Sequence, residues 1–118
     1  MFIVFIVPIF LILFFKFIIW GSNLLLKADN NKNKYTAVFE LDNGREKKVS
    51  FGQKGADDYT ITKDKEQRKR YLDRHRKREN WNNPESAGAL SRWILWGPST
   101  SRRDNIKSFK KRFGYVNV

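Results

Sequence analysis

Hydrophobic positions divide the chain into an apolar N-terminal segment and a mixed, largely polar remainder. Residues 2–20 contain a single charged residue, Lys16, and a single proline, Pro8. About 20 apolar residues rising 1.5 Å each cross a hydrocarbon core of roughly 30 Å. The pattern predicts a transmembrane helix at residues 1–22. Its expected anchoring residues are Phe2, Ile6, Phe10, Phe14, Lys16 and Trp20.

Two other interpretations of this segment stay open, a cleaved signal peptide and a buried helix of a soluble domain. A signal peptide has a positively charged start and a shorter apolar core, whereas no charge precedes this run. A buried helix needs more surrounding chain than a small domain offers. Every Lys and Arg lies at or after position 16, so the positive-inside rule places the C-terminal part in the cytosol.

Beyond this segment, the pattern predicts a polar linker at residues 23–34 and a β-hairpin at residues 35–51. Tyr35, Ala37 and Phe39 alternate with more polar positions, as in a half-buried strand. The sequence Asp-Asn-Gly at 42–44 predicts a type I′ turn, because Asn-Gly supplies the two positive φ angles of that turn.

The C-terminal half predicts helices at residues 64–79, 86–96 and 101–113. Asp64 is a candidate N-cap for the first and Ser101 for the last, and Gly114 suits a C-cap. The complete fold prediction is α+β: an N-terminal transmembrane helix, one β-hairpin and two to three short helices. The hairpin and helices form a small basic domain at residues 35–118.

Positive charge points to an acidic partner. The net charge is +12 with a sequence pI near 10.2, and seven of the eleven residues from Arg68 to Arg78 are Lys or Arg. Phosphate, acidic protein and anionic lipid all attract such charges. The residues expected to bind the partner are Arg68, Lys69, Arg70, Arg74, Arg76, Lys77, Arg78, Arg92, Arg102, Arg103, Lys110, Lys111 and Arg112.

The sequence contains few residues that could act in catalysis. There is no cysteine and a single histidine, His75, so thiolate chemistry is excluded and a histidine-based metal centre is not expected. Gly52 and Gly55 do not have the spacing of a phosphate-binding loop. The sequence predicts a protein that is not an enzyme and needs no cofactor, with a binding or structural role.

Three stretches carry a resemblance to a known group. They are FGQKGADDYTITKDKEQRKRYLDRHRKRENW at 51–81, SRWILWGPST at 91–100 and IKSFKKRFG at 106–114. Together they resemble small basic proteins of nucleocytoplasmic large DNA viruses, the giant viruses, over Phe51 to Gly114. No activity of that group is transferred with the resemblance. It implies a virion setting, in which a protein shell covers an internal membrane that encloses DNA.

This setting and the apolar segment together lead to two expectations. The first is a structural virion protein, a membrane-anchored minor capsid protein that links the icosahedral shell to the internal membrane. It would contact the lipid membrane and the major capsid protein or other minor capsid proteins. It would lie beneath the capsid, and in host intracellular membranes during assembly. The alternative is a membrane-tethered protein that binds DNA without sequence preference and anchors the genome.

Overall fold

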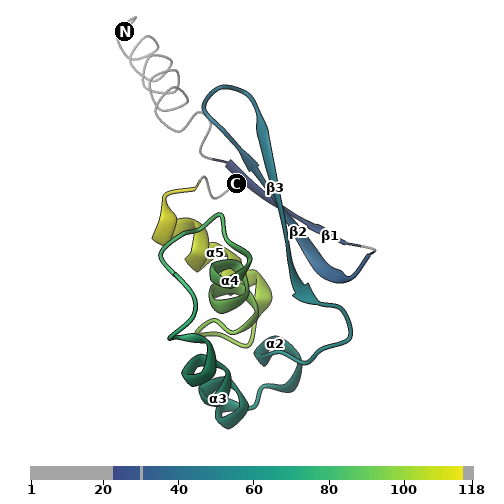
Figure 1. The fold of residues 1–118 in the computed structure, drawn as a ribbon, viewed down its shortest axis with the longest axis vertical. Coiled ribbons are helices and arrows are strands. Elements are labelled where there is room, and N and C mark those ends of the chain that lie inside the picture. The colour runs from purple at the N-terminus through teal and green to yellow at the C-terminus, as the bar shows by residue number, and fades with distance from the viewer. Residues whose placement is uncertain (1–22, 30, 116–118) are drawn as a thin grey trace, which may run out of the picture.

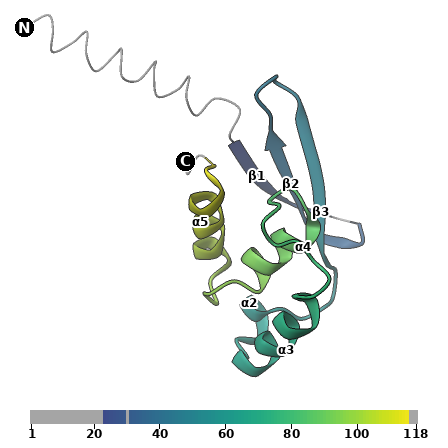
Figure 2. The same cartoon turned by 60° about the vertical axis from the view of Figure 1, so that its left-hand side comes forward.

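The computed structural model describes residues 23–29 and 31–115, which form a three-stranded antiparallel sheet with its helices on one face (Figures 1 and 2). The strands are β1 (Asn23–Ala28), β2 (Asn33–Glu40) and β3 (Glu46–Gln53). The helices are α2 (Tyr59–Thr62), α3 (Lys65–His75), α4 (Ala87–Leu90), the π-helical η1 (Ser91–Leu95) and α5 (Arg102–Phe113).

The sheet has the order β1-β2-β3, and both neighbouring pairs are antiparallel. Phe39 pairs with Leu24 on one side and with Lys47 on the other. Because side chains alternate between the two faces of a strand, Leu24, Ala37 and Phe51 share the face that the helices cover. Each of these three is at most 2 % exposed.

The fold prediction is wrong about the linker. Residues 23–28 are β1, the third strand of the sheet, rather than polar linker. Three consecutive leucines give no alternating pattern in the sequence, although within the strand Leu24 is buried and Leu25 is 55 % exposed. A lone hairpin is marginally stable in water, and the added strand gives the sheet the width that it needs to hold a core.

The fold prediction also includes a transmembrane helix, and none is found in the part of the chain that the structure describes. The segment expected to span the bilayer, residues 1–22 with its six anchoring positions, lies outside the described residues. Among residues 23–29 and 31–115, no helix combines the length and the apolar character needed to cross a membrane. The fold is corrected to a small α+β domain with a three-stranded antiparallel sheet and several helices.

The hairpin between β2 and β3 lies where the sequence predicts it, but its turn differs. The Leu41 N–H donates to the Arg45 carbonyl at 2.8 Å, which leaves a three-residue loop at 42–44. Gly44 has φ of 81°, whereas Asn43 is not among the described residues with positive φ. A three-residue loop with glycine in the left-handed position replaces the predicted type I′ turn.

Side chains at the N-termini of the helices fix where each helix begins. Asp64 accepts hydrogen bonds from the N–H groups of residues 66 and 67, as predicted for the start of α3. Ser86 caps α4 and Ser101 caps α5 in the same way, and Gly114 ends α5 with φ of 79°. The predicted 64–79 helix is shorter than expected, since α3 ends at His75. The predicted 86–96 helix changes from α to π geometry at Ser91.

A buried ion pair connects the sheet to the helical layer. Lys34 in β2 donates from Nζ to Oδ2 of Asp58 at 2.6 Å, and the two side chains are 14 % and 2 % exposed. The other carboxylate oxygen of Asp58 accepts from the backbone N–H of Thr60 at 2.8 Å and so caps α2. One carboxylate therefore fixes both the entry into the helices and the start of β2.

We predict that Asp58→Ala lowers the free energy of unfolding by about 3 kcal/mol, because it leaves the Lys34 ammonium group without its carboxylate. Urea unfolding followed by circular dichroism measures this change. Lys47→Met is the control, since the ion pair of Lys47 with Glu85 spans 3.5 Å at the surface and is expected to contribute less than about 1 kcal/mol. Equal losses in the two variants would contradict the structural role of the buried pair.

Candidate functional site

Two tryptophans and two arginines form a surface cluster, here called the Arg–Trp cluster and made of Trp81, Arg92, Trp93 and Arg112. The guanidinium of Arg92 lies 4.1 Å from the Trp93 ring centroid and 5.1 Å from that of Trp81. The guanidinium of Arg112 lies 3.8 Å from the Trp93 ring. The Trp93 indole N–H donates to the Trp81 carbonyl at 2.9 Å and holds the two tryptophan segments together.

The Arg–Trp cluster is oriented by the π-helical segment and the loop that follows it. The Trp96 N–H donates to the Ser91 carbonyl at 3.0 Å, which is the hydrogen bond of a π turn. Asn105 of α5 is fully buried and donates from Nδ2 to the carbonyls of Ile94 and Ser99, at 2.9 and 2.7 Å. Its Oδ1 accepts from the Ser99 N–H at 3.0 Å. This side-chain amide ties the end of η1 to α5.

Burial and neighbouring cations disfavour the charged form of Arg92. Burial is the largest cause, and together with the positive charges of Arg68, Arg112 and Arg76, in that order, it lowers the pKa of the guanidinium to about 10. Its buried Nε has no hydrogen-bond partner among the described residues. Within residues 23–29 and 31–115, no arginine lies within 4.0 Å of a carboxylate oxygen in an ion pair. The positive field around Arg92 is therefore not neutralised by the described part of the chain.

The predicted basic residues separate into outward and inward ones. Exposed positions in and just after α3 are Lys69, Arg70, Arg74, Arg76, Lys77 and Arg78. Those of α5 are Arg102, Arg103, Lys111 and Arg112, with Lys110 half-buried. Arg68 and Arg92 point inward instead. Arg68 donates from Nε to the carbonyls of Trp96 and Gly97, and Arg92 donates from Nη1 to that of Trp96.

A cleft of about 490 Å³ lies beside the Arg–Trp cluster, between η1 and α5. It is lined by Trp93, Pro98, Ser108, Phe109, Lys111 and Arg112. Phe109 is buried at its base, while Lys111 and Arg112 are exposed at its rim. The cleft therefore presents an aromatic surface and positive charge together.

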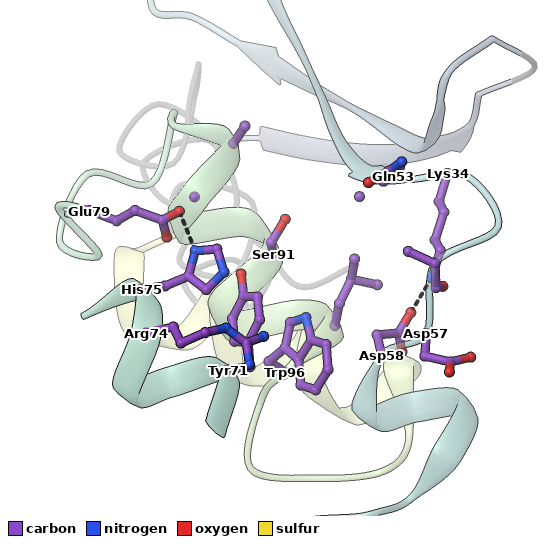
Figure 3. A pocket seen from close by; sticks show the side chains of 15 residues that line it. Lys34, Gln53, Asp57, Asp58, Tyr71, Arg74, His75, Glu79, Ser91 and Trp96 are labelled. Carbon is purple, nitrogen blue, oxygen red and sulfur yellow. Dashed lines mark hydrogen bonds and ion pairs between the residues drawn. The ribbon is translucent and has the colours of Figure 1, made fainter. Parts of the chain in front are cut away.

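A second cavity, here called the central hollow, has a volume of about 430 Å³ and lies between the end of β3 and helix α3 (Figure 3). Tyr71, His75 and Trp96 form one wall, in which Tyr71 lies between the other two rings. The Tyr71 centroid is 4.1 Å from that of His75 and 4.2 Å from that of Trp96. The Nδ1 atom of His75 is 3.0 Å from Oε1 of Glu79, and Oε2 of Glu79 accepts from the Trp81 indole at 2.9 Å.

Sequence analysis did not predict several of the residues that form these surfaces. Lys34 and Asp58 are far apart in the chain, and nothing local signals their pairing. Glu79 follows His75 by four residues, a spacing at which side chains of a helix meet, so that contact was available to sequence reasoning. In the described part of the chain, no group of three or more His, Cys, Asp or Glu side chains is arranged to hold a metal ion.

Comparison with known protein families matches part of the chain. A family model described as "Family of unknown function (DUF5754)" matches residues 25–75, from β1 to the end of α3. This segment is less than half of the chain, so it shows a similarity to that family over the sheet and the first helices. No curated protein and no solved structure matches the chain. The resemblance to giant-virus proteins at 51–114 stays a prediction.

The expectation of a membrane-anchored minor capsid protein stays a prediction, because the matched family is one of unknown function. Its anchor is expected at residues 1–22, which lie outside the described residues. The described residues contain no helix able to span a membrane, and the family match gives no support to a virion or capsid role.

We predict that Gly97→Ala destabilises the loop that supports the Arg–Trp cluster. A Cβ at position 97 would lie 2.3 Å from the Trp93 carbonyl oxygen and 2.7 Å from the Asn105 amide. Because the obstructing carbonyl is backbone, we expect a loss of about 3 kcal/mol, at the upper end of the range for overpacking. Urea unfolding measures the loss, and near-ultraviolet circular dichroism reports the rearranged tryptophans.

The control for this variant is Pro98→Ala at the exposed neighbouring position. It removes a conformational restraint without adding a contact, so we expect a change within about 1 kcal/mol. A Gly97→Ala protein as stable as this control would show that Asn105 and the loop adapt freely, and would contradict the tight packing at Gly97.

Proposed function

We propose that this protein binds single-stranded nucleic acid without sequence preference. The observation that carries the proposal is the Arg–Trp cluster, in which the Trp93 ring lies within 4.1 Å of two guanidiniums next to a cleft of about 490 Å³. Proteins that bind single strands combine a positive groove for the backbone with aromatic rings on which bases stack. The cluster supplies both kinds of contact within a few residues.

The exposed cations around the Arg–Trp cluster suit a phosphate backbone. The electrostatic influence of Arg76 and Arg112 on Arg92 places the end of α3 and the last turn of α5 around one centre of positive charge. Since described carboxylates do not pair with these arginines, a polyanion would relieve their mutual repulsion. Contacts to phosphates carry no sequence information, which is the reason for expecting little sequence preference.

The aromatic residues favour a single strand over a duplex. Stacking on Trp93 or Trp81 requires a base whose face is free, and bases within a duplex are already stacked on their neighbours. The exposed positions of α3 and α5 are mainly Lys and Arg, which suit a phosphate backbone. Together with the aromatic rings, these residues support recognition of the backbone and of base faces.

We predict that the affinity for a single-stranded oligonucleotide falls steeply with salt. If about five phosphates are neutralised, log K should fall against log salt with a slope near −3.5. Fluorescence anisotropy of a labelled single strand of about 20 nucleotides, measured from about 50 to 300 mM salt, gives the slope. A slope near zero, or a preference for an acidic peptide of equal charge, would contradict the proposal.

We predict that the double variant Arg74→Glu, Arg78→Glu weakens binding at least about tenfold at low salt, because it reverses two exposed charges at the end of α3. The matched control is Lys27→Glu, Lys48→Glu, which makes the same change in net charge. Both control positions are exposed on the sheet face that the helices do not cover. An equal loss in both double variants would show attraction to overall charge and no localised interface.

A further inference from the structure

The central hollow and a neighbouring basic depression share two residues. The depression, here called the basic hollow, has a volume of about 400 Å³ and is lined by Asp73, Arg74, His75, Lys77 and Arg78. Arg74 and His75 also line the central hollow. Both spaces therefore border the side chains of Arg74 and His75, near the C-terminal end of α3.

Charge in the central hollow is mixed. Lys34 and Arg74 face Asp57, Asp58 and Glu79 around it. Lys34 is engaged with Asp58, and Glu79 with His75. A phosphate group would meet carboxylates on several sides here. A neutral group with both donors and acceptors fits this lining better.

The basic hollow has the opposite character, with Arg74, Lys77 and Arg78 around a single carboxylate, Asp73. All four side chains belong to exposed residues. None of the three cations has an ion-pair partner among the described residues. This space suits a phosphate group.

One wall of the central hollow is aromatic, and its His75 also lines the basic hollow. Tyr71 is covered on both faces, by His75 and by Trp96, so its ring is fixed in place (Figure 3). The His75 side chain at the end of this column is 36 % exposed, and its ring is oriented by Glu79. An unpaired base can pack against such a wall, because every base has a π-face.

Resting on the proposed function, we propose that the two hollows together hold one nucleotide of the bound strand. Its unpaired base enters the central hollow and its phosphate lies over Arg74, Lys77 and Arg78. Polar side chains around the base would be those of Gln53, Asp57 and Ser91, which line the central hollow. None of the three side chains makes a hydrogen bond with another described residue. These groups include donors and acceptors that meet the edge of a base. The volume lies in the range of small-ligand sites.

The test compares two strands of equal length, one carrying bases and one made of abasic sites, so that both have the same number of phosphates. Full-length wild-type protein should bind the base-bearing strand about tenfold more tightly or better. Ala87→Leu and Ala56→Leu each add a branched apolar side chain at an exposed position that lines the central hollow. Each should reduce that preference about fivefold, with little change in binding of the abasic strand.

Ala28→Leu is the matched control, because Ala28 is exposed in β1 and lines none of the three cavities described above. It should retain the wild-type preference. If the wild-type protein binds both strands and the preference survives in Ala87→Leu and Ala56→Leu, the nucleotide site is wrong while the proposed function holds. If neither strand binds at low salt, the proposed function itself fails and this inference with it. Two variants that fill the central hollow are used, so that the test still stands if one of them folds poorly.

Discussion

The side-chain amide of Asn105 is the constraint on which the arrangement of the helical layer depends. Its three hydrogen bonds connect α5 to the last turn of η1 and to the loop at 97–101. A buried amide is stable only when its polar atoms are paired, so the three backbone partners must stay where they are. Gly97 permits this approach, since any Cβ there would collide with the amide. The positions of Trp93 and Trp96 follow from that connection.

Arg68 and Arg92 show how a very basic chain uses part of its charge for structure. Both guanidiniums donate to the Trp96 carbonyl, so two cations meet at one backbone oxygen. Inward arginines fix the rings, while the exposed arginines and lysines of α3 and α5 face solvent. Arginine therefore has two roles here: inward side chains hold the site together, and outward side chains give it positive charge.

Patterns within a few residues predicted much of the secondary structure. Contacts between residues far apart in the sequence were not predicted. The caps Asp64, Ser101 and Gly114 were read correctly, because a cap depends on residues within one turn. The strand at 23–28 was missed because its three consecutive leucines show no period of two, and only the pairing with β2 reveals it. The Lys34–Asp58 pair and the Arg–Trp cluster join segments distant in sequence, so no spacing rule reveals them. For the site, the sequence identified the basic residues but not which of them turn inward.

The π-helical geometry of η1 has a consequence for the rotational phase of the chain. A hydrogen bond from residue 96 to residue 91 holds one residue more than an α-helical turn does. Relative to a regular α-helix, the chain that leaves this turn at Trp96 is rotated by about 100°, the angle that one residue subtends. Trp93 lies within the turn and against Arg112, whereas Trp96 lies at its end and stacks on Tyr71. The extra residue therefore contributes to the different directions of the two rings.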